Sequence, residues 1–221
     1  MNSVILAIDT ALDYCSVAIY KKKCIYSLSE NVQKKHTEKI LPMIHKILIQ
    51  SNIILTELNY IAFTKGPGSF SGVRIASGIA ESLSLILNIP IIGVSTLAIM
   101  AEKAWRKYKK DKIIVIINAN VKQVYWAKYI KDNQSFWIGE RTESLLKKSL
   151  LKNTIKNEKD VWTIVGHGWK DCKYEQILYK NQAKFFSPNA KDIIPFALLN
   201  IQNKIFFSNI TNNLNYLHNI F

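Results

Sequence analysis

The sequence predicts an α/β fold with mixed β-sheets flanked by helices, divided into two lobes. Short apolar runs alternate with longer segments of helical periodicity, in the order strand, strand, strand, helix, strand, helix, strand, helix. The strand-first pattern then starts again after a basic segment at residues 106–110. We therefore expect an N-terminal lobe of residues 1–110 and a smaller, degenerate C-terminal lobe of residues 111–221.

Residues 4–64 contain the first four predicted strands and the first predicted helix. Apolar runs at 4–8, 15–20 and 24–29 predict three meandering strands, with a turn at 9–13. A helix is expected to begin at His36 or Thr37, because apolar residues follow at helical spacing: Ile40, Leu41, Ile44, Ile47 and Leu48. Pro42 inside this pattern predicts a kink or a first helical turn. A fourth strand is expected at 59–64.

The next predicted helix, at residues 71–87, has two faces that can pack. One is an apolar stripe, and the other is a line of small residues: Ile75, Ile79, Leu83 and Ile86 on the first, Gly72, Ala76, Ala80 and Ser84 on the second. One side is expected to cover the sheet and the other to meet a helix or another chain. A strand at 90–94 and a helix at 95–105 complete the lobe.

The second predicted lobe begins with strands at 113–118, 124–130 and 136–139. A polar helix is expected at 142–151, and a strand at 161–165 ends in a turn with two glycines, Gly166-His167-Gly168. Residues 191–207 are expected to be largely helical.

The net charge of +14 suggests an acidic partner, but its distribution argues against a dedicated nucleic-acid groove. Residues 1–110 hold 14 basic and 7 acidic residues and residues 111–221 hold 16 and 9, so each half carries +7. Only three of the 30 basic residues are arginine, as expected of lysine-rich coding in an AT-rich genome. We therefore expect a weak, salt-sensitive attraction to RNA rather than a specific RNA site.

The cysteines and the apolar runs indicate a cytoplasmic protein. Cys15, Cys24 and Cys172 are odd in number and form no C-x-x-C pair, so we interpret them as reduced packing residues. No apolar run reaches the length expected of a membrane span, and no signal-peptide pattern precedes the first strand.

The glycine-rich turn contains Gly66, Pro67, Gly68, Ser69 and Gly72, and it joins a strand to a helix N-terminus. Such a junction can present backbone N–H groups to an anion or a partner. Its spacing matches neither the P-loop nor the dinucleotide-binding fingerprint. Ser71 is expected to be the N-cap of the following helix.

The turn at Asp9 and Thr10 leaves two interpretations open: a vestigial phosphate turn, or a simple Asx turn. His36, His45, His167 and His218 lack metal-ligand spacing, so no metal is expected. No two glycines are adjacent, so a complete adenosine turn is missing as well, and Gly166-His167-Gly168 is its nearest approach.

These segments resemble the bacterial TsaB (YeaZ) family along nearly the whole chain. The matching stretches are residues 5–11 with 15–18, 36–43, 66–75, 92–97, 124–127, 165–169 and 216–217. The glycine-rich block at 66–75 is the specific part of the match, and the late stretches are weaker. The chain departs from the family pattern at Asn118, Asn120 and Gln123, where the family usually has Asp, Arg and Glu.

The resemblance implies a two-lobe actin-like fold and a non-catalytic, cytoplasmic subunit without cofactor or metal. In that family's pathway TsaC makes threonylcarbamoyl-adenylate, and TsaD transfers the threonylcarbamoyl group to the tRNA adenosine next to the anticodon. The implied partners are the paralogue TsaD, as a heterodimer, and the ATPase TsaE, with tRNA reached indirectly through the complex and no membrane. The chain alone is also expected to form a homodimer. TsaD-like relatives carry a His-rich metal motif where residues 94–100 here contain no histidine.

The family pairs with TsaD through its first two helices, which places the expected interface on the helices that begin near Thr37 and Ser71. The residues expected there are Thr37, Ile40, Leu41, Ile44, Arg74, Ile75, Gly78, Ile79, Ser82 and Leu83. The opposite interpretation, in which both lines of the second helix are internal core, remains open.

Three other functions are weighed against this one. A kinase-like enzyme would use Asp9 and the glycine-rich turn to bind ATP, and a glycoprotease-like peptidase would need a nucleophile such as Ser71 or a metal. A plain RNA-binding module would need a concentrated basic face with stacking aromatics.

Overall fold

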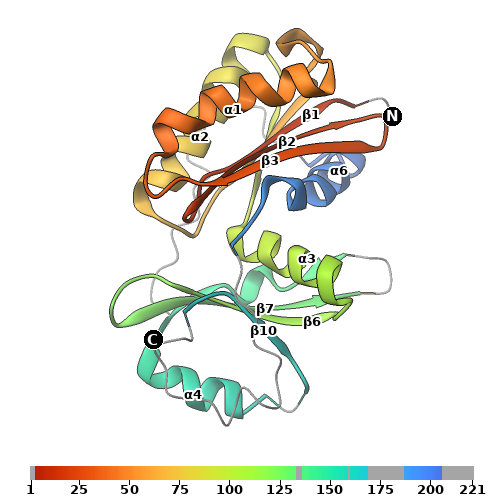
Figure 1. The fold of residues 1–221 in the computed structure, drawn as a ribbon. Helices are drawn as coiled ribbons and strands as arrows, with labels where there is room; N and C mark the ends of the chain where they lie inside the picture. Colours follow the sequence, from red (N-terminus) through yellow and green to blue (C-terminus); the bar gives the residue numbers. More distant parts are fainter. Residues whose placement is uncertain (1–2, 133–135, 159, 169–186, 206–221) are drawn as a thin grey trace. The chain divides into compact units, whose positions relative to one another are not determined.

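The computed structural model describes residues 3–132, 136–158, 160–168 and 187–205. The chain divides into two units, each with its own sheet (Figure 1). The first unit runs from Met1 to Thr96 and takes in the chain again from Pro188, and the second runs from Leu97 to Ser187. This division differs from the predicted boundary at 110/111, because the helix before that boundary groups with the second sheet and a late segment returns to the first.

The first sheet has five strands in the order β3-β2-β1-β4-β5. The strands are β1 (Ile5–Asp9), β2 (Tyr14–Lys21), β3 (Cys24–Asn31), β4 (Tyr60–Thr64) and β5 (Ile91–Val94). β2 pairs antiparallel with β1 and β3, whereas β1, β4 and β5 run parallel. The predicted mixed sheet is confirmed, and each predicted strand of this lobe is present.

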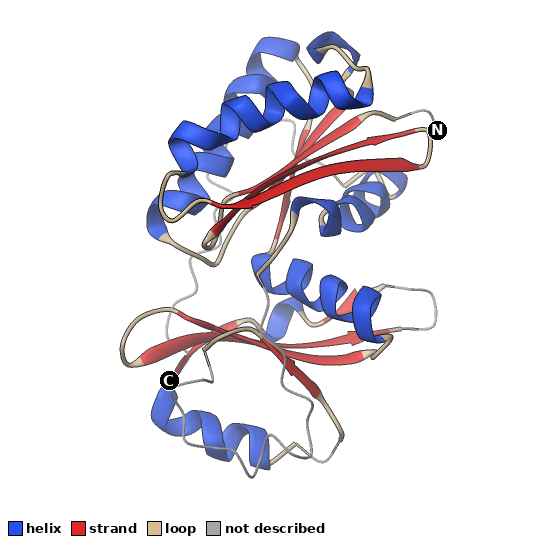
Figure 2. Cartoon of the chain, viewed as in Figure 1, coloured by secondary structure: helices blue, strands red, loops and turns tan. Residues whose placement is uncertain are grey.

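Helices cover both faces of the first sheet (Figures 1 and 2). On one face lie α1 (His36–Ser51) and α2 (Phe70–Leu87), which contact each other. On the other lie η3 (Ala190–Asp192) and α6 (Ile194–Gln202). The end of the predicted helix at 191–207 lies outside the described residues, as do Cys172 and the stretch 216–217. A short helix, η1 (Leu55–Glu57), precedes β4.

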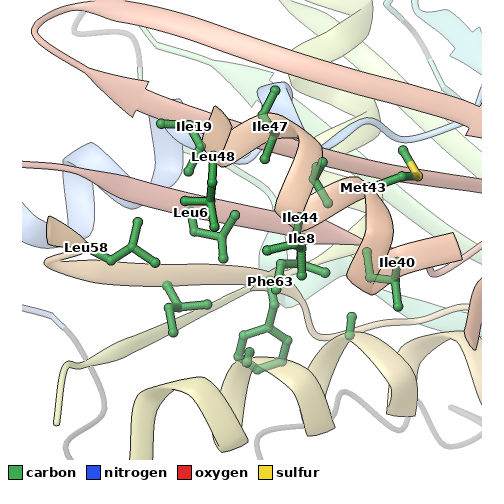
Figure 3. Packing of buried hydrophobic residues seen from close by; sticks show 14 of the residues in the cluster. Leu6, Ile8, Ile19, Ile40, Met43, Ile44, Ile47, Leu48, Leu58 and Phe63 are labelled. Carbon is green, nitrogen blue, oxygen red and sulfur yellow. The ribbon is translucent and has the colours of Figure 1, made fainter. Parts of the chain in front are cut away.

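The core of the first unit lies between the sheet and α1 (Figure 3). β1 contributes Leu6 and Ile8, because alternate residues of a strand point to the same face. α1 contributes one stripe of buried residues, which is Ile40, Met43, Ile44, Ile47 and Leu48. Pro42 lies inside α1 on its exposed side, in the second turn of the helix.

The second unit is built on a sheet in the order β10-β6-β7-β8, with β9 also paired to β7. Its strands are β6 (Lys112–Asn118), β7 (Gln123–Lys131), β8 (Trp137–Ile138), β9 (Ser144–Lys147) and β10 (Thr163–Val165). α3 (Thr96–Tyr108) covers one face and α4 (Lys148–Lys156) the other (Figure 1). A short helix, η2 (Glu140–Thr142), precedes β9.

The predicted helix at 142–151 is wrong in its first half. Residues 144–147 form β9 and pair with β7 at residues 123–126, and the helix begins only at Lys148. The open edge of β7 offers backbone partners that a local sequence pattern cannot reveal, and this pairing overrides the helical tendency of the segment.

A buried ion pair connects α3 to β7. The Nζ atom of Lys131 lies 2.6 Å from Oε2 of Glu102, and the two side chains are 7% and 4% exposed. The indole of Trp137 donates to the same carboxylate oxygen at 2.7 Å. The carboxylate of Glu102 therefore has two hydrogen-bond donors within the second unit, which a buried charge requires.

Candidate partner interface and the glycine-rich turn

Asp9 lies at the end of β1 and is fully buried. One carboxylate oxygen, Oδ1, accepts from the hydroxyl of Thr64 at 2.7 Å and from the backbone N–H of Ala11 at 3.2 Å. The other, Oδ2, accepts from the hydroxyl of Ser16 at 3.2 Å. The bond to Ala11 is an Asx turn, which agrees with the structural interpretation of this residue.

The glycine-rich turn packs directly against the turn that contains Asp9. The hydroxyl of Thr10 donates to the carbonyl of Gly72 at 2.6 Å, and the N–H of Ser69 donates to the carbonyl of Ala11 at 2.8 Å. A Cβ atom on Gly72 would lie 2.1 Å from the carbonyl oxygen of Thr10, and one on Gly68 would lie 2.5 Å from that of Ala11. These two glycines therefore serve the close approach of two backbone segments.

The N-cap of α2 is Ser69 rather than the predicted Ser71. The hydroxyl of Ser69 accepts from the N–H of Gly72 at 3.0 Å, and its backbone is extended as an N-cap requires. Ser71 is the second residue of the helix, and its side chain is exposed. The predicted cap lies two residues after the cap in the structure, where the helix begins at Phe70.

His36 is a third connection to the same turn. Its ring Nε2 lies 2.7 Å from the carbonyl of Leu12, which makes this nitrogen the donor, and the side chain is buried. The histidine at the first turn of α1 thus fixes the turn between β1 and β2, and its Nε2 is occupied by this contact.

The turn at Asp9 and Thr10 and the adjoining glycine-rich turn do not fit a nucleotide phosphate. The carboxylate of Asp9, the hydroxyl of Thr10 and the N–H of Ser69 already bond within the first unit. In the second unit, Gly166 and Gly168 pack on the backbone of β6: their Cβ atoms would lie 2.1 Å from the carbonyl oxygen of Ile116 and 2.8 Å from the carbonyl carbon of Ile117. This turn is therefore also a packing element.

Titratable side chains of the described residues form no group of three that could hold a metal ion. Burial, with the nearby charges of Asp9 and Glu30, raises the pKa of the Cys15 thiol from 9.0 to about 12. This thiol is protonated at neutral pH and is a poor nucleophile.

Two of the four α1 residues expected at a partner interface are exposed, and two are buried. Thr37 and Leu41 are exposed, the latter by 58%. Ile40 and Ile44 are only 1% and 5% exposed, so the prediction that they face a partner is wrong. Both side chains lie on the apolar stripe of α1 that packs on the sheet (Figure 3). An amphipathic helix has one such stripe, so these residues cannot also face a partner.

The small residues of α2 determine which side of the helix faces the interior of the first unit. Gly72, Ala76 and Ala80 are buried, so the small line faces the interior. The predicted residues Ile75, Ile79 and Leu83 are half-buried and pack against the core cluster, along the flank of the helix. The outward line consists of Arg74, Gly78, Ser82, Leu85 and Ile86, all of them exposed.

Sequence reasoning missed the most exposed apolar residues of this layer. They are Ile49 on α1 and Phe70, Leu85 and Ile86 on α2, with exposed fractions of 66%, 75%, 71% and 77%. The sequence pattern assigns Ile86 to the apolar stripe of α2, and it assigns Ile49, Phe70 and Leu85 to no face. The Arg74 guanidinium stacks over the ring of Phe70, with its central carbon 3.5 Å from the ring centroid.

α2 is long and apolar enough to cross a membrane, by length and composition alone. The expectation that no segment reaches this length is therefore wrong for α2. In the fold, however, the helix connects β4 to β5 and its small line is buried in the first unit. Of its 18 residues, five are buried, six are half-buried and seven are exposed.

Comparison with known proteins identifies the family. A protein called tRNA threonylcarbamoyladenosine biosynthesis protein TsaB from Buchnera aphidicola subsp. Schizaphis graminum is 58% identical over 89% of this chain and 93% of its own length. The Escherichia coli protein of the same name is 41% identical over 87% of this chain and 85% of its own length. The chain belongs to the TsaB (YeaZ) family.

A solved structure and a family model both agree with the assignment to this family. The solved structure of YeaZ from Pseudomonas aeruginosa is 29% identical and superimposes with a TM-score of 0.80, covering 93% of this chain and 96% of its own. The family model for TsaD, the tRNA N6-adenosine threonylcarbamoyltransferase, also matches residues 28–209. The predicted α/β fold, with mixed sheets flanked by helices, is confirmed. The relatives' names place the TsaB family in tRNA threonylcarbamoyladenosine biosynthesis.

Proposed function

We propose that this chain is the non-catalytic subunit of the tRNA threonylcarbamoyladenosine machinery, and that it binds and activates a TsaD-type transferase in the cytoplasm. The contact is made by the outer face of α1 and α2, which we call the helical face. It consists of Thr37, Leu41, Ile49, Phe70, Arg74, Gly78, Ser82, Leu85 and Ile86. The exposed apolar surface of this layer is the observation that carries the proposal.

The helical face has the chemistry of a protein interface. Leu85 and Ile86 expose large apolar side chains next to each other on the last turns of α2. Phe70 and Arg74 add an aromatic ring and a guanidinium, residue types that dominate binding energy at interfaces. Gly78 and Ser82 lie between these two groups, and their small size lets another helix approach closely.

A protein partner explains this face better than a lipid surface does. Arg74 and Ser82 interrupt the apolar residues along the outward line, and a helix inside a bilayer avoids such a charge. The flank of α2, with Ile75, Ile79 and Leu83, packs against the core of its own unit.

The match to the TsaD family model favours a TsaD-type chain as the partner. Two paralogous chains share a fold, so each can present the same helical layer to the other in a pseudo-symmetric pair. By the same reasoning, two copies of this chain can pair through this layer when no TsaD-type partner is present. A TsaE-type ATPase would join the assembled pair, and tRNA would be reached through it.

The polar groups of the first unit support a non-catalytic role. A kinase-like reaction would need Asp9 and the glycine-rich turn to face a nucleotide. The carboxylate of Asp9 instead accepts from Thr64, Ser16 and Ala11, and the glycine-rich turn bonds to Thr10 and Ala11. A peptidase would need an activated nucleophile. The hydroxyl of Ser69 caps a helix, the thiol of Cys15 has a raised pKa, and His36 is bound to Leu12.

The test is co-purification with the TsaD-type transferase of the same organism. Leu85→Glu/Ile86→Glu places two charges on the helical face without touching the core, and it is preferred to Ile79→Glu, which would also disturb packing. The control is Ile138→Glu on β8, where an isoleucine is 62% exposed. We expect the control to bind like the wild type and the double variant to lose the complex.

The activity of the TsaD-type transferase is the second readout for the same variants. With threonylcarbamoyl-adenylate and tRNA supplied, the transferase should be stimulated by the wild type and by Ile138→Glu, but not by the double variant. Failure of the wild type to bind or stimulate the transferase would refute the proposed function. Normal binding by the double variant would instead refute the location of the interface.

A further inference from the structure

The first sheet ends in a long edge strand, β3. It is the outermost strand of its sheet and, among the described residues, it pairs with β2 alone (Figure 1). Its eight residues contain no proline and no lysine, and the one-to-one register with β2 contains no bulge. Proteins commonly use these features to keep an edge strand from further pairing. We call the outward side of this strand the β3 edge.

The register with β2 shows which backbone groups the β3 edge presents. Lys22 and Lys23 form a two-residue turn with positive φ at both positions, and the pair of residues that closes such a turn exchanges both backbone bonds. Bonded pairs then recur at every second residue, and the N–H of Val32 accordingly donates to the carbonyl of Asp13 at 3.2 Å. The residues between the bonded pairs direct their N–H and C=O groups outward: Ile25, Ser27, Ser29 and Asn31.

Lysines lie at both ends of the β3 edge. Two precede the strand at residues 22–23 and two follow it at residues 34–35, and all four are exposed. Within the parts of the chain that the structure describes, these four side chains form no ion pair and no hydrogen bond. The one acidic residue of the strand, Glu30, is bound to Lys39 at 2.9 Å. The edge is therefore positive at its two ends and carries no unbalanced charge between them.

The chemistry of the β3 edge fits a polypeptide. Alternating N–H and C=O groups complement the backbone of another strand, whereas the phosphates of a nucleic acid offer acceptors alone. Ile25 and Tyr26 are 47% and 38% exposed and lie on opposite faces of the sheet, because successive side chains of a strand alternate. A strand paired with the edge would cover part of both side chains, so its central residues are expected to be apolar or β-branched.

Charge distinguishes an acidic chain from a second copy of this one. Two copies paired antiparallel through β3 would bring the lysines at 22–23 of each copy next to those at 34–35 of the other. Like charges in such positions are destabilising, and the net charge of +14 on each copy adds to the repulsion. A segment with acidic residues at its ends would instead meet opposite charges at both ends of the edge.

We propose that the β3 edge binds an extended segment of an acidic protein partner, which adds to the first sheet as a sixth strand. The bound segment is about 26 Å long, the length of eight strand residues, with a neutral centre and acidic ends. This surface lies on β3 rather than on the helical face, so the proposal goes beyond the contact with the TsaD-type transferase.

The test uses a synthetic peptide of sequence EETVTVTVEE and its charge-reversed counterpart KKTVTVTVKK. Binding to the isotope-labelled full chain is followed by amide chemical shifts and amide hydrogen exchange. Ser27→Pro removes an outward N–H without removing a bond to β2, and Ser27→Thr is its matched control. Lys22→Glu/Lys35→Glu reverses one charge at each end of the edge, and Lys107→Glu/Lys110→Glu reverses two exposed lysines of the second unit.

We expect the wild type to bind the acidic peptide about tenfold more tightly than the basic one, because several exposed ion pairs can form at the two ends. The acidic peptide should slow hydrogen exchange at the amides of Ile25, Ser27 and Ser29. Ser27→Pro should bind it about tenfold more weakly, whereas Ser27→Thr and the second-unit control should bind like the wild type. Lys22→Glu/Lys35→Glu should lose the preference for the acidic peptide, and it tests the proposal even if Ser27→Pro does not fold.

Three results would overturn the inference. The first is no binding of the acidic peptide, and the second is equal binding of both peptides without slowed exchange at the β3 edge, which indicates diffuse attraction. The third is a doubling of mass with concentration that Ser27→Pro abolishes, which would make a second copy the occupant. Ser27→Pro should still co-purify with the TsaD-type transferase, because the helical face is unchanged, so the two proposals fail separately.

Discussion

Replacing Gly72 by alanine is expected to destabilise the first unit, whereas the same replacement at Gly78 on the same helix should stabilise it. An added Cβ at Gly72 would lie 2.1 Å from the carbonyl oxygen of Thr10 and 2.5 Å from the hydroxyl of Ser69. At Gly78 an added Cβ meets nothing within 4 Å. The pair therefore separates the effect of close packing from the effect of helix propensity.

The magnitude follows from three contributions. Overpacking of this kind costs about 1–3 kcal/mol, and moving the turns apart would break the buried bond from Thr10 to Gly72, at about 1–3 kcal/mol. The lower chain entropy of alanine returns about 0.5–1 kcal/mol. The net loss for Gly72→Ala is about 3 kcal/mol. For Gly78→Ala only the last contribution applies, so the variant should gain about 0.5–1 kcal/mol.

Urea unfolding with two probes makes the assay specific to the first unit. All five tryptophans lie between residues 105 and 169, so their fluorescence follows the second unit, whereas far-UV circular dichroism follows both. Gly72→Ala should shift the dichroism transition to lower urea, and Gly78→Ala to higher urea. If Gly72→Ala were as stable as the wild type to within about 0.5 kcal/mol, the two turns would not be held together as described.

Two further predictions concern buried titratable groups. Lys131→Met should destabilise the second unit by about 3–5 kcal/mol, because it leaves the Glu102 carboxylate buried without its cation, and adding Glu102→Gln should recover much of this loss in tryptophan-monitored urea unfolding. The raised pKa of Cys15 means that the folded state holds this proton longer than the unfolded state does. Stability from this group is therefore complete below pH 9 and falls as the pH rises toward 12, and Cys15→Ala should flatten this slope in alkaline unfolding titrations. In a Cys24→Ser/Cys172→Ser background, a thiol reagent should label Cys15 only on unfolding; labelling of the folded protein would contradict its burial.

Local periodicity predicted most elements, because their burial patterns repeat within a few residues. The apolar run at 4–8 became β1 at Ile5–Asp9, and the helix expected at 71–87 became α2 at Phe70–Leu87. The segment at 142–151 failed because its outcome depends on the free edge of β7, which is distant in the sequence. The unit boundary failed for the same reason, since the chain returns to the first sheet from Pro188 onward.

The partner interface on α1 and α2 stays a prediction, and five of the ten residues expected there are exposed in the structure. The sequence shows that α2 has two packing lines, and it contains no information on which line meets the strands. Packing on the sheet chose the small line, with Ala76 and Ala80, and left Leu85 and Ile86 outside. For α1, whose single apolar stripe includes Ile40 and Ile44, periodicity alone already indicates that these residues face the sheet.

The glycine-rich turn links these two results, because it sets both the start and the rotation of α2. Ser69 caps the helix, and the contact of Gly72 with Thr10 fixes its first turn against the end of β1. One residue corresponds to about 100° around a helix, so a slip of one position would bury other side chains and turn Arg74 and Gly78 away from their present direction. The proposed partner contact therefore depends on a motif that resembles an anion-binding turn, although that motif lies beneath the helical face. Gly72→Ala should consequently weaken the complex with the TsaD-type transferase by more than its loss of stability explains, although Gly72 itself is buried beneath the helical face.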